Sequence, residues 1–173
     1  MKKLCLLLII VLLAGCTAQA TTQPETKPYV PPGMIIEGPD QFKKDIQSGM
    51  DLLKEKAPEY YKLVNENIIK VYLNDKDENC IYFGKFYGMS KEAYANYTNN
   101  PKNIPYTMAL ALVHEGRHAE RIKQGYFTRT SEKEERIAVE AEKNAAKLMG
   151  APPEIMEFLD IAIETRWWEK QGK

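Results

Sequence analysis

The sequence predicts an α+β domain that is mainly helical and lies behind a short N-terminal leader. Apolar residues recur at helical spacing in several stretches of ten or more residues, which is typical of helices packed on a core. Two shorter runs, at 68–73 and 80–87, are rich in β-branched and aromatic residues and are predicted to be strands. The chain has 173 residues, which suits one domain of ordinary size once a leader is subtracted.

The leader has the pattern of a signal peptide. Two lysines at positions 2 and 3 precede an apolar run over 4–13, which is shorter than the roughly 20 residues that a spanning helix needs. The following Leu13-Ala-Gly-Cys16 resembles the lipobox of prokaryotic lipoproteins. This resemblance implies cleavage after residue 15, lipidation of Cys16 and an extracytoplasmic position on a membrane. The alternative is an ordinary secretory signal that happens to end near a cysteine.

Residues 16–33 are predicted to form a flexible tether, and 34–173 the folded domain. The tether is rich in Thr, Gln and Pro and has almost nothing to bury. Lysine plus arginine number 24, as do aspartate plus glutamate, so no charge excess points to nucleic acid. With Cys16 lipidated, Cys80 is the only thiol of the mature chain and no internal disulfide is possible.

The first half of the domain is predicted to contain two helices and a β-hairpin. A helix begins near Asp40 and runs to Lys56, with its buried stripe at Phe42, Ile46, Met50 and Leu53. A short helix follows over 59–65. The two strands, joined by a polar turn at 74–79, are expected to pair with each other as the hairpin.

The second half is predicted to be helical after an irregular surface loop at 88–103. A helix runs from Pro105 to Gln124, and Gly125 supplies its left-handed cap. Ser131-Glu-Lys-Glu134 has the pattern of a capping box and opens a helix to Met149. A last helix over 154–169 is expected to bury an apolar face formed by Ile155, Phe158, Leu159, Ile161 and Ala162.

The helix over 105–124 carries the chemistry. His114 and His118 are the only histidines of the chain, and four residues apart they lie on one face of a helix. Both imidazoles can therefore reach one metal ion, and Glu115 can act as general base on a water beside it. This is the H-E-x-x-H arrangement of zinc peptidases. The alternative is two unliganded histidines on a helix.

A catalytic zinc site usually has three protein ligands, so a carboxylate must complete this one. The helix after the motif offers five: Glu132, Glu134, Glu135, Glu140 and Glu142. Apolar phasing places the buried face of that helix at 137, 141, 145 and 148. This phase puts Glu135 off the face and Glu140 nearer its edge, so periodicity does not select Glu135.

The segment from 105 to 152 resembles the gluzincin branch of zinc metallopeptidases. The resemblance lies in Leu112-Val-His-Glu-Gly-Arg-His118, in the Glu-x-x-Ala pattern at Glu135 and Ala138, and in Leu148-Met-Gly-Ala-Pro152. It implies a minimal zincin-like fold, with a hairpin before the motif helix and a glutamate-bearing helix after it. It also implies Glu135 as the third ligand and zinc-dependent hydrolysis of peptide bonds. The sequence departs from the family at Val139, where aspartate or asparagine often stands.

The sequence does not identify the residue that would assist the developing oxyanion. Tyr97, Tyr106, Tyr126 and Arg129 are candidates for assisting the developing oxyanion, and the strand over 80–87 could align an extended peptide substrate. Two alternative functions also stand. One is a zincin-like protein that binds without cleaving, and the other is a helical envelope lipoprotein that acts in binding or assembly.

Overall fold

A computed structural model describes residues 33–76, 79–126 and 132–165. The predicted leader, Cys16 and nearly all of the tether lie outside these residues, as do Ser131, Arg129 and the end of the last predicted helix. Within the described ranges, no helix is both long and apolar enough to cross a membrane.

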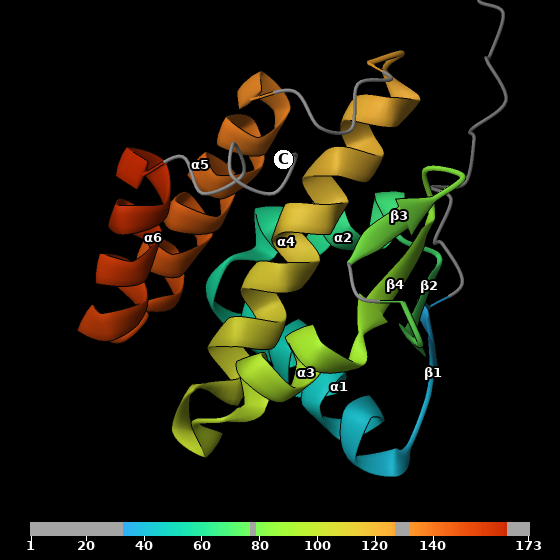
Figure 1. The fold of residues 1–173 in the computed structure, drawn as a ribbon, viewed down its shortest axis with the longest axis horizontal. Helices are drawn as coiled ribbons and strands as arrows, with labels where there is room; N and C mark the ends of the chain where they lie inside the picture. Colours follow the sequence, from blue (N-terminus) through green and yellow to red (C-terminus); the bar gives the residue numbers. More distant parts are fainter. Residues whose placement is uncertain (1–32, 77–78, 127–131, 166–173) are drawn as a thin grey trace, which may run out of the picture. The chain divides into compact units, whose positions relative to one another are not determined.

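The described residues form a mainly helical α+β domain, as the sequence predicts (Figure 1). The strands are β1 (Ile35–Glu37), β2 (Lys70–Asn74), β3 (Cys80–Tyr82) and β4 (Phe86–Ser90). The helices are α1 (Asp40–Lys56), α2 (Pro58–Asn67), α3 (Lys91–Thr98), α4 (Ile104–Lys123), α5 (Glu132–Met149) and α6 (Pro153–Thr165), with a 3₁₀ turn, η1 (Pro101–Asn103), before α4.

The strands pair differently from the predicted hairpin. The four strands form one sheet in the order β1-β2-β4-β3, in which β2 is parallel to both β1 and β4. The antiparallel pair is β3 with β4, so a hairpin does precede α4, but β3 and the start of β4 both fall in the single run predicted at 80–87. After β2 the chain moves to the outer edge of the sheet and returns between β2 and β3.

A tight turn splits the predicted strand in two. Phe83 and Gly84 both have positive φ, at 50° and 66°, and the Lys85 amide donates to the Tyr82 carbonyl oxygen at 3.1 Å. Left-handed backbone at two successive residues reverses the chain and is easily adopted by glycine. A single glycine, Gly84, inside an aromatic run is a weak turn signal. For this reason the sequence predicted one continuous strand and no turn here.

The segment predicted as an irregular loop at 88–103 is largely ordered as regular structure. It contains the end of β4, then α3 and η1. The hydroxyl of Ser90 caps α3 by accepting from the Ala93 amide at 3.0 Å. A serine ahead of Lys-Glu-Ala is an ordinary N-cap signal, and the prediction of a loop here was wrong.

Helix α4 is the element around which the others pack. It contacts α1, α2, α3, α5 and β3, and α6 reaches the domain through α5 (Figure 1). Its residues from Met108 to Val113 are all buried. The predicted stripe on α1, at Phe42, Ile46, Met50 and Leu53, is confirmed, because all four side chains are buried in the same core. The chemistry-bearing turn of α4 is therefore held from several sides.

Helices α1 and α4 approach closely at Gly49. A Cβ added there would lie 2.7 Å from the Ala109 amide nitrogen and 2.8 Å from the Met108 Cβ, so backbone would have to move. We expect Gly49→Ala to lower the free energy of unfolding by about 1–3 kcal/mol, as overpacking does. Denaturant unfolding measures this change.

Gly116→Ala is the matched control for Gly49→Ala. It is also a glycine inside a helix, but its Cβ would meet Val64 at an ordinary 3.5 Å. The alanine should then stabilise the helix by up to about 1 kcal/mol. If Gly49→Ala proved as stable as the wild type, the close approach of α1 and α4 would be refuted.

Candidate metal centre

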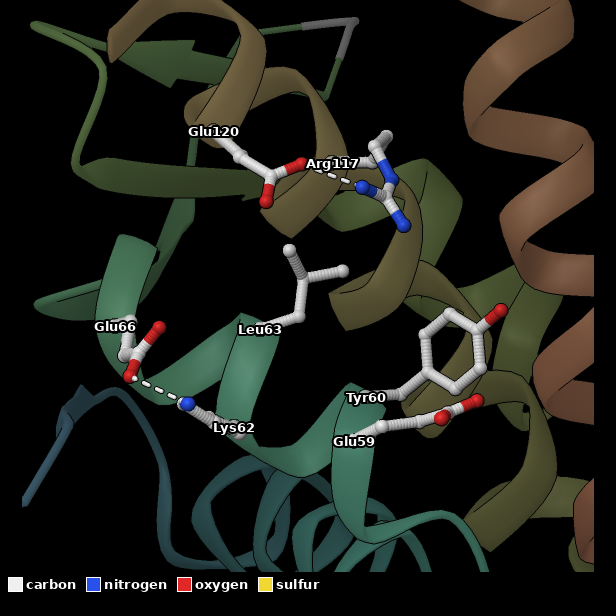
Figure 2. Close-up of a pocket in the computed structure, with 7 residues that line it drawn as sticks. All are labelled: Glu59, Tyr60, Lys62, Leu63, Glu66, Arg117 and Glu120. Carbon is white, nitrogen blue, oxygen red and sulfur yellow. Dashed lines mark hydrogen bonds and ion pairs between the residues drawn. The ribbon is translucent and has the colours of Figure 1, made fainter. Parts of the chain in front are cut away.

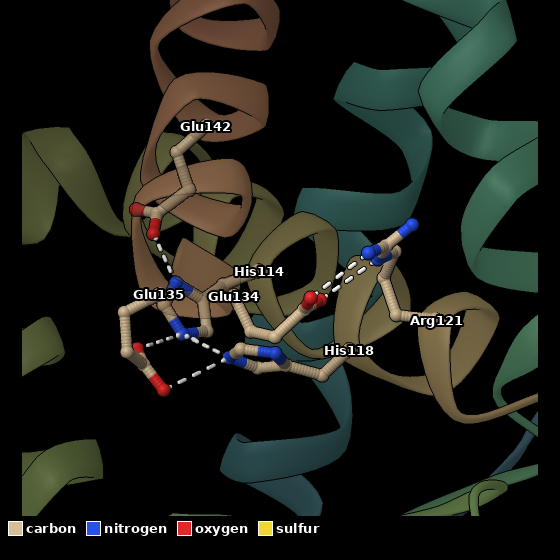
Figure 3. Close-up of polar contacts among 6 residues, drawn as sticks. All are labelled: His114, His118, Arg121, Glu134, Glu135 and Glu142. Atoms are coloured by element: carbon tan, nitrogen blue, oxygen red, sulfur yellow. Dashed lines mark hydrogen bonds and ion pairs between the residues drawn. The ribbon is translucent and has the colours of Figure 1, made fainter. Parts of the chain in front are cut away.

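The two histidines of α4 point to the same place. Their Nε2 atoms lie 3.0 Å apart, and their rings meet edge to face with centroids separated by 4.6 Å (Figure 3). The His118 residue is 9% exposed, and the His114 side chain is 16% exposed. The one-turn spacing predicted from the sequence has thus placed both imidazoles at a single, mostly buried point.

Glu135 brings a carboxylate to this point from α5. One of its oxygens lies 3.4 Å from the Nε2 atom of His114, and the other lies 3.4 Å from the Nε2 atom of His118. Among the described residues, these three form the only group of three or more histidine, cysteine or acidic side chains whose ligand atoms gather closely enough to hold a metal ion. Glu135 is the carboxylate that the family resemblance indicated.

The spacing of the donor atoms fits a tetrahedral metal. Zinc bonds of about 2.0–2.2 Å at a tetrahedral angle place neighbouring ligand atoms about 3.3–3.5 Å apart. The observed separations are 3.0 Å between the two nitrogens and 3.4 Å from each nitrogen to a Glu135 oxygen. Two imidazoles and one carboxylate are also a known catalytic donor set for zinc, so the residues fit the ion in both chemistry and geometry.

The charges of the cluster favour a cation at its centre. Burial lowers the pKa of His114, but the carboxylates of Glu142, Glu135 and Glu115 outweigh it, and the pKa stands well above its usual value. Burial raises the pKa of Glu135, yet its contacts with both histidines bring the pKa down to about 2. Metal binding should therefore compete with protonation of His114.

Glu142 holds the far side of the His114 ring. Its Oε1 atom lies 2.5 Å from Nδ1 of His114, so with Nδ1 as donor the ring turns the lone pair of Nε2 toward Glu135 and His118 (Figure 3). A carboxylate on the second nitrogen of a metal-ligating histidine is the usual way in which such rings are oriented. From the sequence, Glu142 was expected only as a candidate metal ligand. Its place seven residues after Glu135, on the same face of α5, was the signal for this role.

The rival carboxylates are occupied elsewhere. Glu134 is buried and forms a bidentate ion pair with Arg121, at 2.7 and 2.8 Å (Figure 3). Glu140 is exposed and pairs with Arg136 at 2.9 Å along the outer face of α5. Neither approaches the Nε2 atoms in this structure, so of the three carboxylates left open as third ligand, only Glu135 does.

The phase predicted for α5 was right at Ala141 and Ala145, which are buried, and wrong at Leu148. Leu148, assigned to the buried face, is 51% exposed, and the buried residues are Glu134, Ala138, Val139, Ala141, Ala145, Ala146 and Met149. With this phase, the two carboxylates that meet His114 lie at the edge of the buried face toward α4. Alanines form most of that face. Alanine is only weakly hydrophobic, so the periodicity of apolar residues does not reveal which face of α5 is buried.

The general-base candidate is buried beside the cluster. Glu115 is 7% exposed and follows His114 directly on α4. Its negative charge contributes to the raised pKa of His114 and also to those of Tyr87 and Tyr97. The charge of Glu115 therefore acts on the first histidine.

Three of the four candidates for oxyanion assistance can be placed. The ring of Tyr126 stacks on the Arg121 guanidinium at 3.5 Å, and Tyr106 lies two helical turns before His114 at the start of α4. The hydroxyl of Tyr97 accepts from Asn79 Nδ2 at 3.2 Å. Arg129 lies outside the described residues. Burial raises the pKa of Tyr97, and the charges of Glu142 and Glu115 contribute to this shift.

A surface hollow on α2 and α4 is separate from the histidine cluster. It has a volume of about 400 Å³ and is lined by Glu59, Tyr60, Lys62, Leu63, Glu66, Arg117 and Glu120 (Figure 2). Its two cations are already paired, Arg117 with Glu120 at 2.5 Å and Lys62 with Glu66 at 3.7 Å. It contains neither histidine, so it is not the cleft of the candidate centre.

Replacing Glu142 tests its orienting role. We expect Glu142→Gln to weaken zinc binding by about 10–100-fold, as the loss of a carboxylate behind a ligating histidine does elsewhere. The amide keeps the shape but loses the charge that stabilises the Nδ1 hydrogen bond. Competition with a chelator of known affinity measures the change, and an unaltered affinity would count against this role.

The chain matches no known protein-family model, no curated protein and no solved structure. The centre therefore has to be interpreted from its own geometry.

Proposed function

We propose that the protein is a zinc-dependent peptidase in which His114, His118 and Glu135 hold the metal and Glu115 is the general base. The observation that carries this proposal is the convergence of two Nε2 atoms and one carboxylate at separations of 3.0–3.4 Å. The charge pattern supports it, since the carboxylates of Glu142, Glu135 and Glu115 raise the pKa of His114 and so favour a positive charge at this point.

The work of the bound ion and that of the chain are distinct. A zinc ion in such a site polarises a carbonyl and lowers the pKa of a ligated water toward neutrality. Glu115 takes the proton from the attacking water and delivers it to the leaving amine. Its burial next to His114 keeps this carboxylate close to the reacting atoms and shields it from bulk water.

The chain also controls the protonation of its own ligands. Glu142 accepts the Nδ1 hydrogen of His114, which leaves Nε2 as a lone-pair donor. Arg121 binds Glu134 in a bidentate ion pair, so this neighbouring carboxylate is neutralised rather than left to compete for the metal. As a result, the carboxylate of Glu135 lies at the ligand position and that of Glu142 lies behind His114.

The cellular setting is part of the proposal. The lipobox-like ending at Cys16 favours a lipid-anchored protein on the outer side of a prokaryotic membrane, with a peptide or protein as substrate. The neutral charge balance gives no support for nucleic acid as a partner. An envelope lipoprotein without catalysis is the alternative that the experiment must exclude.

Zinc content and peptide hydrolysis test the proposal together. The purified chain should contain about one zinc ion per molecule and should cleave an unstructured protein or a mixed peptide library. His118→Ala should lose both the zinc and the activity, because only two ligands would be left. Metal analysis and mass spectrometry of the products are the measurements.

The outcomes separate the alternatives. A chain without stoichiometric metal would overturn the zinc centre. A chain that binds zinc through both histidines but cleaves nothing would overturn the catalytic function and leave a metal-binding protein.

A further inference from the structure

The carboxylate ligand of the candidate centre lies in the first turn of its helix. Helix α5 begins at Glu132, and its first four residues read Glu-Lys-Glu-Glu, with Glu135 as the fourth. The first amides of a helix have no partner within it, and helix ends fray. Because all four side chains are charged, this turn has no apolar group that could pack on the core. A polar contact that fixes the first turn therefore also fixes the ligand.

Glu134 supplies such a contact. It is 5% exposed, and its two oxygens accept hydrogen bonds from Arg121 on α4, from Nε at 2.7 Å and from Nη2 at 2.8 Å (Figure 3). The side chain of Arg121 is itself mostly buried, at 17% exposed. A two-point contact between a planar guanidinium and a planar carboxylate fixes direction as well as distance. It ties the first turn of α5 to α4 at the residue next to Glu135.

Arg121 is held from a second side by the end of its own helix. After Gly125, which has φ 92°, the amide of Tyr126 donates to the carbonyl oxygen of Arg121 at 3.0 Å. This turn brings the Tyr126 ring over the Arg121 guanidinium, with 3.5 Å between the guanidinium carbon and the ring centre. Stacking on the face of a guanidinium leaves its N–H edge available for a carboxylate. Arg121 is therefore oriented by α4 and its cap, independently of α5.

The ion pair and the ligand contact are neighbours on both helices. His118 and Arg121 are three residues apart on α4, which makes them neighbours on its surface. Arg121 meets Glu134, and His118 Nε2 lies 3.4 Å from a Glu135 oxygen. Successive side chains of a helix point about 100° apart, so holding Glu134 against α4 fixes the rotation of the turn that carries Glu135.

We propose that Arg121 is a positioning residue of the metal centre, which holds Glu134 and so sets the first turn of α5 with Glu135 facing both histidines. This inference rests on the proposed function in so far as Glu135 is a metal ligand. It differs in sign from a purely electrostatic role of Arg121. Loss of a positive charge near the centre would strengthen the binding of a cation, whereas loss of positioning weakens it.

Removal of both members of the pair tests the proposal in the full chain. Arg121→Ala/Glu134→Ala leaves the net charge unchanged and leaves no buried charge without its partner, which would endanger folding. We expect zinc affinity to fall by about 10-fold or more, as it does when an outer partner of a metal ligand is lost. Chelator competition at pH 7 measures the affinity.

Arg121→Lys separates position from charge. Lysine keeps the positive charge but cannot hold both oxygens of Glu134 in one plane. We expect this variant to bind zinc more weakly than the wild type and more tightly than the double variant. Wild-type affinity in Arg121→Lys would show that the charge alone suffices and would overturn the positioning role.

Arg136→Ala/Glu140→Ala is the matched control. It removes the other arginine–glutamate pair of α5, whose side chains are 63% and 49% exposed, and Arg136 directly follows Glu135 in the chain. The change in composition and charge is the same, so zinc affinity should stay as in the wild type. Equal losses in the two double variants would overturn a specific role of Arg121.

A measurement in the metal-free chain separates this inference from the proposed function. In an α-helix the amides of residues 136–139 bond to the carbonyls of residues 132–135, so their hydrogen exchange reports whether the first turn is formed. We expect these amides to exchange about 10-fold faster or more in Arg121→Ala/Glu134→Ala, with exchange in α1 unchanged. If the wild type binds no zinc, the proposed function fails, and the exchange still decides whether the pair holds the turn. The inference is overturned if the double variant keeps the zinc affinity of a zinc-binding wild type, or if these amides exchange as in the wild type.

Discussion

Glu115→Gln is expected to lower kcat by about 10²–10⁴-fold while the zinc content stays at about one ion per chain. Glutamine has the shape of glutamate, so the packing around this buried position is kept. It cannot accept a proton from water at neutral pH, so the step that depends on the base is lost. Hydrolysis of a fluorogenic peptide and metal analysis of the same sample measure the two quantities.

Glu120→Gln is the control on the same helix. Glu120 points toward Arg117, on the side of α4 that borders the hollow with α2, away from the histidine cluster. This variant removes a charge at a half-buried position and should retain full activity. Equal losses in both variants would mean that the fall in kcat reflects net charge or folding rather than a base at position 115.

Glu135→Gln is expected to weaken zinc binding by more than about 100-fold, beyond the range expected when an outer partner is lost. A neutral amide oxygen is a poorer ligand than a carboxylate, and the site would lose its one negative ligand. Two histidines would then be the only protein ligands left. Chelator competition at pH 7 measures the affinity, and hydrolysis should fall in parallel.

Glu140→Gln is the matched control for the third ligand, because it was the rival favoured by helical phasing. Its carboxylate is half exposed and pairs with Arg136 on the outer side of α5. Such an exposed pair contributes little to stability, and zinc affinity should not change. A loss of zinc in Glu140→Gln with normal binding in Glu135→Gln would reverse the assignment of the ligand.

The elements that the sequence predicted well are those governed by neighbours along the chain. The stripe on α1 and both ends of α4 depend on local spacing and capping, and they were confirmed, including Gly125 at φ 92° after the last turn. The strand pairing depended on a partner many residues away and on one turn at Phe83 and Gly84, and it was predicted wrongly. A strand run does not encode which strand will lie beside it.

In the candidate centre, too, the features that depend on local spacing were predictable and those that depend on distant contacts were not. The histidines of α4 are four residues apart, so their shared face and the neighbouring glutamate followed from helix geometry alone. The choice among the glutamates of α5 did not, because it depends on how two helices pack and on which cations stand nearby. Arg121 binds Glu134, Arg136 binds Glu140, and Glu135 meets the Nε2 atoms.

By itself, then, the sequence determined a mainly helical α+β domain and the paired histidines with their glutamate, since each depends on the period of one helix. Tertiary structure decided the order of the strands, the phase of the alanine-lined α5 and the carboxylate behind His114. These features are contacts between segments distant along the chain, and local periodicity carries no information about such contacts.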